Sequence, residues 1–283
     1  MRSSHLNYNG SLYHSDKLFI SPDNRSFRYG DGFFETMKMV NGKIILADYH
    51  FERLFQSLEL MQFEKPAWYT AAYLEEQVLN LAKQNGHEQL ARIRLTIFRG
   101  DGGLYDTENN FPNFIIQTWE MNIALNSFNE NGLVLDIFPD ARKTCDLFSG
   151  IKSNNYLPYV MAAFWAKKNK LNDALILNSN ERIAEATIAN IFIVKDGVIK
   201  TPALSEGCVN GVTRKYLLKC LRDENIPVQE TWVSVDDALS ASEVFLTNAA
   251  YHLKWVSSVG ESNYKKQLSA HLYDKFIRPL LTA

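Results

Sequence analysis

One lysine of this chain has an unusual setting. Lys152 is the only charged residue in positions 149–157, SGIKSNNYL, a stretch rich in glycine, serine and asparagine at the start of a predicted helix. Most lysines are solvated surface cations, and that remains the alternative interpretation. The setting nevertheless marks Lys152 as a candidate functional residue.

A carboxylate further along the chain is the second candidate. Glu185 lies in residues 182–190, RIAEATIAN, among small and apolar neighbours. Burying an ionised carboxylate is unfavourable unless it is paired. Glu185 is therefore predicted to pair with a cation or with a protonated ring nitrogen. The alternative is a surface acid that follows a β-turn.

Two further segments could form a phosphate site. Residues 207–214, GCVNGVTR, place a glycine and a hydroxyl where a helix is predicted to begin. Free N–H groups and the helix dipole converge at such a position and favour an anion. Residues 247–250, TNAA, end a predicted strand in small polar residues that could complete the site. Gly211 has a plainer interpretation as the start of a helix, and Asn248 as a turn former.

Predicted helices and strands must position these residues. Asn41-Gly42 between apolar runs predicts a hairpin of residues 33–40 and 43–46, and Asp48 is a suitable N-cap for the next helix. Strands and helices alternate irregularly, which indicates an α+β fold with an antiparallel or mixed sheet. The other predicted helices are 71–84, 154–168 and 212–223, and the other strands are 90–98, 113–119, 133–138, 173–177, 190–194, 198–201 and 244–247.

The length of 283 residues favours two domains. Residues 120–130 are polar and weakly patterned, so the domain junction is predicted there. This gives a small N-terminal α/β domain over 1–120, a linker over 121–130 and a larger C-terminal domain over 131–283.

Composition and motifs exclude several classes of protein. The net charge of −2 gives no sign of a nucleic-acid or membrane surface. No apolar run reaches the ~18 residues of a membrane-spanning helix, and the N-terminus lacks a signal-peptide core, so a cytoplasmic protein is expected. The three cysteines form no metal pair or disulfide framework, and no metal is expected. Gly30-Asp31-Gly32 begins like a dinucleotide fingerprint, but Glu35 replaces its third glycine.

Several motifs together resemble one family. The chain is similar to the class-IV aminotransferases, the fold-type IV pyridoxal 5'-phosphate enzymes, which include branched-chain and D-amino acid aminotransferases and aminodeoxychorismate lyase. The resemblance implies a two-domain, D-amino acid aminotransferase-like fold and a homodimer with active sites near the subunit interface. The matching segments are 29–36 (YGDGFFET), 50–54 (HFERL), 92–94 (RIR), 151–152, 185 with 190, 201–202, 211–214 and 245–248.

The resemblance also implies a role for each candidate residue in binding pyridoxal 5'-phosphate. Arg53 has an alternative role as an ordinary exposed arginine of a helix. The implied roles are Lys152 on the cofactor aldehyde, Glu185 on the pyridine nitrogen, Tyr156 near the ring hydroxyl, Arg53, Val212 and Thr213 on the phosphate, Asn248 and Ala249 close by, and Tyr29 and Arg94 on the substrate side.

Three functions fit this resemblance. The preferred one is 4-amino-4-deoxychorismate lyase, which releases 4-aminobenzoate and pyruvate in the folate pathway. Asn248 favours it, since branched-chain transaminases tend to carry Gly-Thr there, and residues 208–211 and 99–103 also look lyase-like. An amino acid aminotransferase of branched-chain or D-amino acid type is the alternative, because Glu35 and Asn155-Tyr156 suit it equally. The third, an inactive binding protein, disagrees with the presence of both Lys152 and Glu185.

Overall fold

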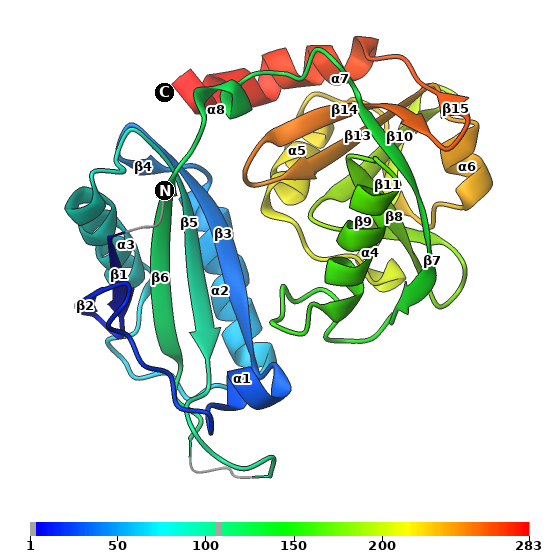
Figure 1. The fold of residues 1–283 in the computed structure, drawn as a ribbon. Helices are drawn as coiled ribbons and strands as arrows, with labels where there is room; N and C mark the ends of the chain where they lie inside the picture. The colour runs from blue at the N-terminus through cyan, green and yellow to red at the C-terminus, as the bar shows by residue number, and fades with distance from the viewer. Residues whose placement is uncertain (1–3, 106–108, 283) are drawn as a thin grey trace. The chain divides into compact units, whose positions relative to one another are not determined.

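The computed structural model describes residues 4–105 and 109–282. The chain forms two compact units, which are described separately below (Figure 1). The first unit contains Met1–Ile123 and Ile151–Asn155, and the second contains Ala124–Gly150 and Tyr156–Ala283. The short segment that carries Lys152 thus belongs to the first unit.

The first unit is built on an antiparallel sheet with the strand order β2-β1-β6-β5-β3-β4. The hairpin predicted around Asn41-Gly42 is confirmed, because both residues have the positive φ angles, 49° and 74°, that a type I′ turn requires. The strands are β1 (His5–Tyr8), β2 (Ser11–His14), β3 (Gly32–Val40), β4 (Lys43–Ile44), β5 (Leu90–Phe98) and β6 (Asn113–Glu120).

Three helices belong to this unit: α1 (Arg25–Tyr29), α2 (Ala47–Leu60) and α3 (Ala71–Asn85). Alternate residues of β3, β5 and β6 form one buried core with the apolar sides of α2 and α3. The predicted Asp48 cap is wrong: Leu46 is the N-cap, and Asp48 lies in the first helical turn. An acidic side chain there still interacts favourably with the helix dipole.

The segment Ile151–Asn155 is anchored to the beginning of β3. The N–H of Phe34 donates to the carbonyl of Lys152 at 2.9 Å, and the N–H of Asn154 donates to the carbonyl of Gly32 at 2.9 Å. Phe33 and Ser153 form an isolated β-bridge between these two bonds. Backbone pairing therefore fixes the position of Lys152 within the first unit.

The second unit is built on a mixed sheet with the order β12-β11-β10-β13-β14-β7-β8-β9, and β15 pairs with β14. The pairs β11–β12, β14–β7 and β7–β8 are parallel, and the others are antiparallel. The strands are β7 (Leu133–Lys143), β8 (Asp173–Asn178), β9 (Ile183–Ala186), β10 (Asn190–Lys195), β11 (Val198–Pro202), β12 (Val228–Thr231), β13 (Glu243–Asn248), β14 (His252–Val259) and β15 (Ser262–Asn263).

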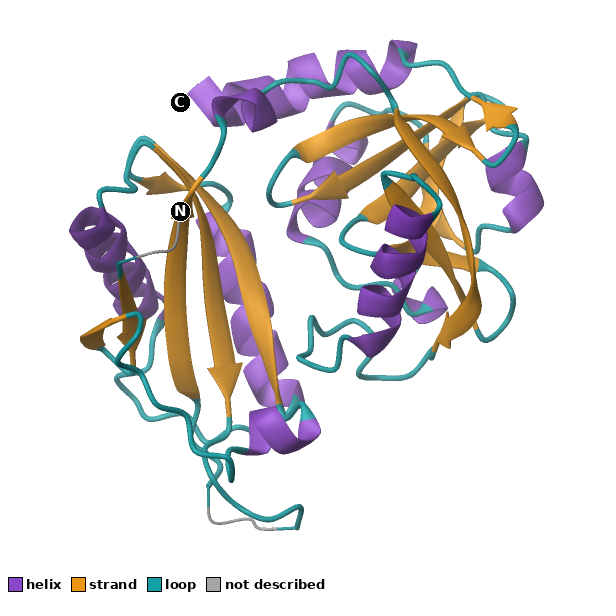
Figure 2. Ribbon diagram, in the orientation of Figure 1, coloured by secondary structure: helices purple, strands orange, loops and turns teal. Residues whose placement is uncertain are grey.

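Two longer helices accompany this sheet (Figure 2). Helix α4 (Leu157–Lys168) packs its buried side against β7 and β8, and Pro158 occupies its first turn as predicted. Helix α5 (Val212–Asp223) has the predicted bounds. The shorter helices are η1 (Ile123–Asn126), η2 (Leu204–Glu206), α6 (Val235–Leu239), α7 (Gln267–Leu272), η3 (Tyr273–Ile277) and α8 (Arg278–Thr282).

The architecture confirms the predicted α+β class, since one unit has an antiparallel sheet and the other a mixed one. None of the helices within residues 4–105 and 109–282 is long and apolar enough to cross a membrane.

Candidate active site

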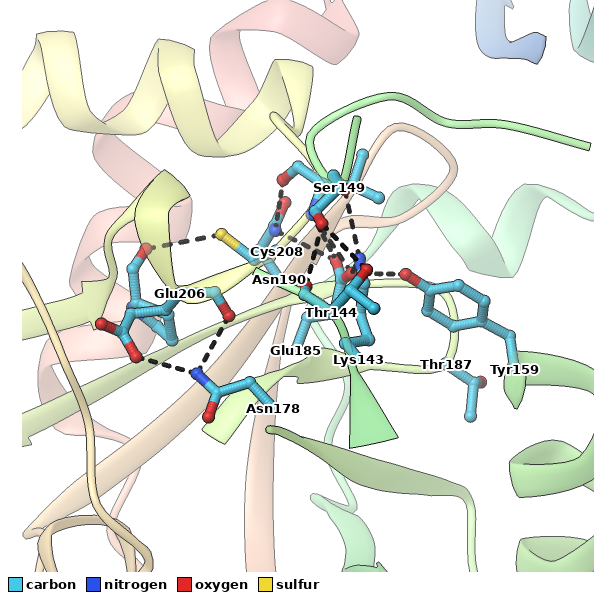
Figure 3. A network of polar contacts seen from close by, with 12 residues as sticks. Lys143, Thr144, Ser149, Tyr159, Asn178, Glu185, Thr187, Asn190, Glu206 and Cys208 are labelled. Atoms are coloured by element: carbon cyan, nitrogen blue, oxygen red, sulfur yellow. Dashed lines mark hydrogen bonds and ion pairs between the residues drawn. The ribbon is translucent and has the colours of Figure 1, made fainter. Parts of the chain in front are cut away.

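Glu185 lies in β9 and is only 3% exposed. Its Oε1 atom accepts a bond from Lys143 Nζ at 2.7 Å and from the Tyr159 hydroxyl at 2.6 Å. The N–H of Val209 donates to both carboxylate oxygens at 3.1 Å, and the Asn190 amide lies 3.4 Å from Oε2. Figure 3 shows the side chains of Lys143, Tyr159 and Asn190 around the carboxylate. The predicted pairing of a buried Glu185 with a cation is therefore present, and the cation is Lys143.

Helix α4 supplies two tyrosines to the same region. Tyr156, at the N-cap position, stacks on Tyr159 with ring centroids 4.3 Å apart, and its hydroxyl lies 3.4 Å from the Thr187 carbonyl. Burial, reinforced by the neighbouring Glu185 carboxylate, raises the pKa of Tyr159 well above its usual range. Tyr159 therefore remains a hydrogen-bond donor to Glu185 at any ordinary pH.

The start of α5 has the features of an anion site. Gly211 is its N-cap and provides no side chain to cap the helix, so the first N–H groups remain available. A Cβ atom at Gly211 would collide with the Asn190 amide, which explains why glycine occupies this position. Val212 and Thr213 are the first two helical residues. The predicted phosphate site thus has an uncapped helix N-terminus at its centre.

The end of β13 lies beside this helix. The Thr213 hydroxyl donates to the carbonyl of Asn248 at 3.0 Å. The Asn248 side chain in turn accepts from the N–H groups of Ala250 and Tyr251 at 2.9 and 3.0 Å, which closes a turn around Ala249. The second unit therefore brings together the predicted residues Val212, Thr213, Asn248 and Ala249.

The first unit holds Lys152, Arg94 and Tyr29. The Lys152 ammonium lies 4.7 Å from the centre of the Phe34 ring, and the Arg94 guanidinium lies 3.6 Å from it. Such contacts orient both cations by cation–π attraction. Tyr29 ends α1, is 40% exposed, and has the Arg25 and Arg28 guanidinium groups near its ring.

Arg53 lies in α2 and is buried, in contrast to the exposed helical arginine considered as its alternative. Its Nε and Nη2 atoms bind the Glu35 carboxylate at 2.7 and 2.5 Å, and His50 Nδ1 lies 2.7 Å from the same group. Burial alone would raise the pKa of Glu35, but Arg53 and His50 together lower it to about 2. His50 thus has a structural contact with a buried carboxylate.

The sequence did not reveal the roles of Lys143 and Tyr159. Tyr159 could have been found, because it lies three residues after Tyr156 and so shares a face of α4. Lys143 lies beyond the predicted strand 133–138, whereas β7 continues to this residue after an irregularity in its register with β8. A pattern of apolar residues gives no signal for such a strand extension.

Known proteins are similar to this chain in sequence. Residues 32–259 match the family model "Amino-transferase class IV", and the chain belongs to this family. It is 30% identical over 244 residues to the aminodeoxychorismate lyase of Vibrio harveyi, covering 85% of this chain and 88% of that one. It is 29% identical over 249 residues to the D-alanine aminotransferase of Staphylococcus haemolyticus, covering 86% and 84%.

A solved structure gives the same fold. The branched-chain aminotransferase of Thermoproteus uzoniensis superposes with a TM-score of 0.88 at 23% identity, over 99% of this chain and 95% of that one. The predicted fold-type IV architecture and the predicted class of pyridoxal-phosphate enzyme are both confirmed.

The second unit fits this cofactor. Glu185 Oε2 carries only the longer of the carboxylate's bonds and can accept a ring N–H, while the uncapped start of α5 suits a phosphate. When bound, the cofactor supplies an electron sink for the charge that develops at the amino-bearing carbon of the substrate. The residues of this chain would hold and orient that group.

Proposed function

We propose that this protein is a 4-amino-4-deoxychorismate lyase, which forms 4-aminobenzoate and pyruvate. The observation that carries the proposal is the turn closed by the side chain of Asn248 beside Thr213. A Gly-Thr pair, which branched-chain transaminases tend to carry here, has no side-chain amide to accept these two N–H bonds. The identity of 30% to the Vibrio harveyi lyase supports the same choice.

The roles proposed for individual residues follow the family resemblance. Lys152 would hold the cofactor through its aldehyde and would accept the proton of the amino-bearing carbon of the substrate. Glu185 holds the ring nitrogen, and Tyr156 lies near the ring hydroxyl. The further proposed contacts are Arg53, Val212 and Thr213 to the phosphate, with Asn248 and Ala249 close by, and Tyr29 and Arg94 to the substrate.

An amino acid aminotransferase is the second candidate. The identity of 29% to a D-alanine aminotransferase, over a similar share of the chain, favours it. The two reactions differ in what they require: a lyase needs no amino acceptor, whereas a transaminase needs a 2-oxo acid to complete its cycle.

The decisive experiment uses this difference. The purified holoenzyme is mixed with 4-amino-4-deoxychorismate and no oxo acid, and separately with leucine, glutamate or D-alanine. Release of 4-aminobenzoate and pyruvate in equal amounts over many turnovers is expected. Rapid, reversible bleaching of the cofactor band by one of the amino acids, with no aromatic product, would instead establish the transaminase.

The role of Lys152 has a separate chemical test. Borohydride reduction followed by digestion is expected to leave the cofactor on the peptide that contains Lys152. Attachment to another lysine would contradict the assignment. Lys152→Ala is expected to lose most turnover and still bind the cofactor noncovalently.

We also propose a homodimer, in keeping with the family resemblance, and a cytoplasmic location. One surface of the second unit suits a contact between two copies. It is a groove of about 460 Å³, in which Leu157, Met161 and Phe164 of α4 are 66%, 48% and 64% exposed. Asp140 and Lys168 also line it, so a two-fold contact could pair their opposite charges. Phe164→Glu is expected to shift the sedimentation coefficient to that of a monomer.

A further inference from the structure

The two oxygens of Glu185 are used differently. Oε1 accepts the two short bonds, from Lys143 Nζ at 2.7 Å and Tyr159 at 2.6 Å. Oε2 receives only the shared Val209 N–H at 3.1 Å and the Asn190 amide at 3.4 Å. Oε1 thus has two short bonds, whereas Oε2 has only longer ones. We expect a ring N–H to bind at Oε2.

All four groups around the carboxylate are donors. Each of them directs an N–H or O–H group at a carboxylate oxygen. Tyr159, Val209 and Asn190 carry no charge in these bonds, so Lys143 is the cation of the set.

The side chain of Lys143 is buried in the interior of the second unit. Its side chain is 10% exposed and that of Glu185 is 4% exposed. Its ammonium also donates to the carbonyl of Ser149 at 3.3 Å and lies 5.3 Å from the centre of the Tyr159 ring (Figure 3). These contacts hold the charge on the Oε1 side of the carboxylate.

We propose that Lys143 is a positioning residue that keeps the shared proton on the ring nitrogen of the cofactor instead of on Glu185. This inference rests on the proposed role of Glu185. A ring nitrogen and a carboxylate in a hydrogen bond compete for one proton. Because the Lys143 ammonium is in contact with the carboxylate and the ring nitrogen is expected at Oε2, the Lys143 charge favours the ionised carboxylate more than it disfavours the protonated ring nitrogen. The effect is strong because water is excluded from the pair.

A merely structural ion pair would behave differently. It would hold β7 to β9 and stabilise the fold, but the position of the proton would not depend on its charge. The experiment must therefore locate the proton directly, at a ring nitrogen that reports its own protonation.

The test uses holoenzyme reconstituted with cofactor labelled with ¹⁵N in the ring, and the ¹⁵N chemical shift is the readout. Lys143→Met removes the charge and keeps the length, and Lys143→Gln removes the charge and keeps a donor in case the Met variant binds cofactor poorly. Lys143→Arg keeps the charge. The signal is expected to move toward the unprotonated position in the two neutral variants and to stay at the wild-type position in Lys143→Arg. Turnover is expected to fall about tenfold in the two neutral variants. This corresponds to a change of about one pKa unit in the competition between the ring nitrogen and Glu185 for the proton.

Glu185→Gln separates the role of Lys143 from that of Glu185. If its signal moves but those of Lys143→Met and Lys143→Gln do not, the role of Lys143 is wrong and that of Glu185 stands. The role of Lys143 is equally wrong if the signal of Lys143→Arg moves as far as those of the neutral variants. If the signal of Glu185→Gln does not move, Glu185 does not face the ring nitrogen and both proposals fail.

Discussion

Glu35 and Glu185 are both buried carboxylates, and both are paired with a buried cation, yet their surroundings differ. In the first unit, Arg53 binds both oxygens of Glu35 and His50 adds a third short contact. In the second unit, the short contacts of Glu185 are all on Oε1, and Oε2 has only longer ones. Both oxygens of Glu35 thus have a short bond from their own unit, whereas Oε2 of Glu185 has none and is the oxygen at which we expect a ligand.

We propose that this difference separates a binding carboxylate from a structural one. Burial and a cationic partner are common to both residues, so neither distinguishes a binding group from a structural one. The distribution of donors between the two oxygens does distinguish them. We therefore expect changes at Glu185 to affect the reaction and changes at Glu35 to affect stability.

The largest effect is expected from Glu185→Gln, which keeps the shape of the side chain and removes its charge. In enzyme saturated with cofactor, kcat should fall roughly a thousandfold, or about 4 kcal/mol in the barrier, because the ring nitrogen loses its anionic partner. Steady-state kinetics at saturating cofactor measure this change.

The matched control is Glu243→Gln. Glu243 is also a buried carboxylate of the second unit, but it begins β13 and accepts from the N–H groups of Leu268 and Ser269. The kcat of Glu243→Gln should stay within about twofold of wild type, because the bonds from neutral N–H groups to Glu243 stabilise the fold. Equal losses of kcat in both variants would show that any buried charge change disturbs the site.

The second effect concerns Glu35 and acid stability. The pKa of the Glu35 carboxyl, about 2, lies below its ordinary value of 4.5. The ionised carboxylate therefore stabilises the folded protein above pH 4.5, and this stabilisation is lost as the pH falls toward 2. The shift corresponds to about 3 kcal/mol in the free energy of unfolding. Burial also lowers the pKa of His50 below 6.5. Because the unfolded chain then takes up this proton more readily, the protein also loses stability as the pH falls below 6.5.

Urea unfolding at a series of pH values tests this expectation. Glu35→Gln should be less stable at neutral pH and should lose little more between pH 4.5 and 2, while the wild type falls steeply. Glu181→Gln is the control, because Glu181 pairs with Arg142 through two bonds at an exposed position, and its curve should follow the wild type. A Glu35→Gln curve with the wild-type slope would contradict the assignment.

The sequence predicted local structure best where a few neighbouring residues decide it. Asn41-Gly42 predicted its turn because only residues that tolerate positive φ suit it. The bounds of α5 were also correct. The Asp48 cap failed because several residues of a helix start are plausible caps and tertiary contacts choose among them.

The site was predicted in part for the same reason. The uncapped start of α5 follows from Gly211 and its neighbours, and the family motifs predict roles for Lys152 and Glu185 together. Lys143 could not be predicted, because its contact with Glu185 spans 42 residues and depends on how β7 and β9 lie in one sheet. Such a pairing is a property of the fold and leaves no pattern along the chain.

The third effect separates the two possible roles of Arg53. Arg53→Met leaves the Glu35 carboxylate without its cation, and destabilisation would obscure any change in cofactor binding. The double variant Glu35→Gln/Arg53→Met removes both charges and should recover part of the stability. If Arg53 also binds the phosphate, the double variant should still bind cofactor roughly tenfold more weakly than Glu35→Gln alone, as expected for one charge-assisted contact. Equal affinities of the two variants in an apoenzyme titration would restrict Arg53 to a structural role.

The smallest effect is expected at Thr213, in the unit that carries Glu185. Its hydroxyl donates to the carbonyl of Asn248 and so joins the start of α5 to the end of β13. Thr213→Val removes this bond and keeps the shape of the side chain, whereas Thr213→Ser keeps the hydroxyl. Loss of one neutral hydrogen bond corresponds to about 1 kcal/mol, so the cofactor affinity of Thr213→Val should fall about fivefold while that of Thr213→Ser stays near the wild type. Fluorescence titration of the apoenzymes measures both constants. An equal loss in Thr213→Ser would assign the effect to the methyl group and its packing, and the hydroxyl would then have no part in the phosphate site.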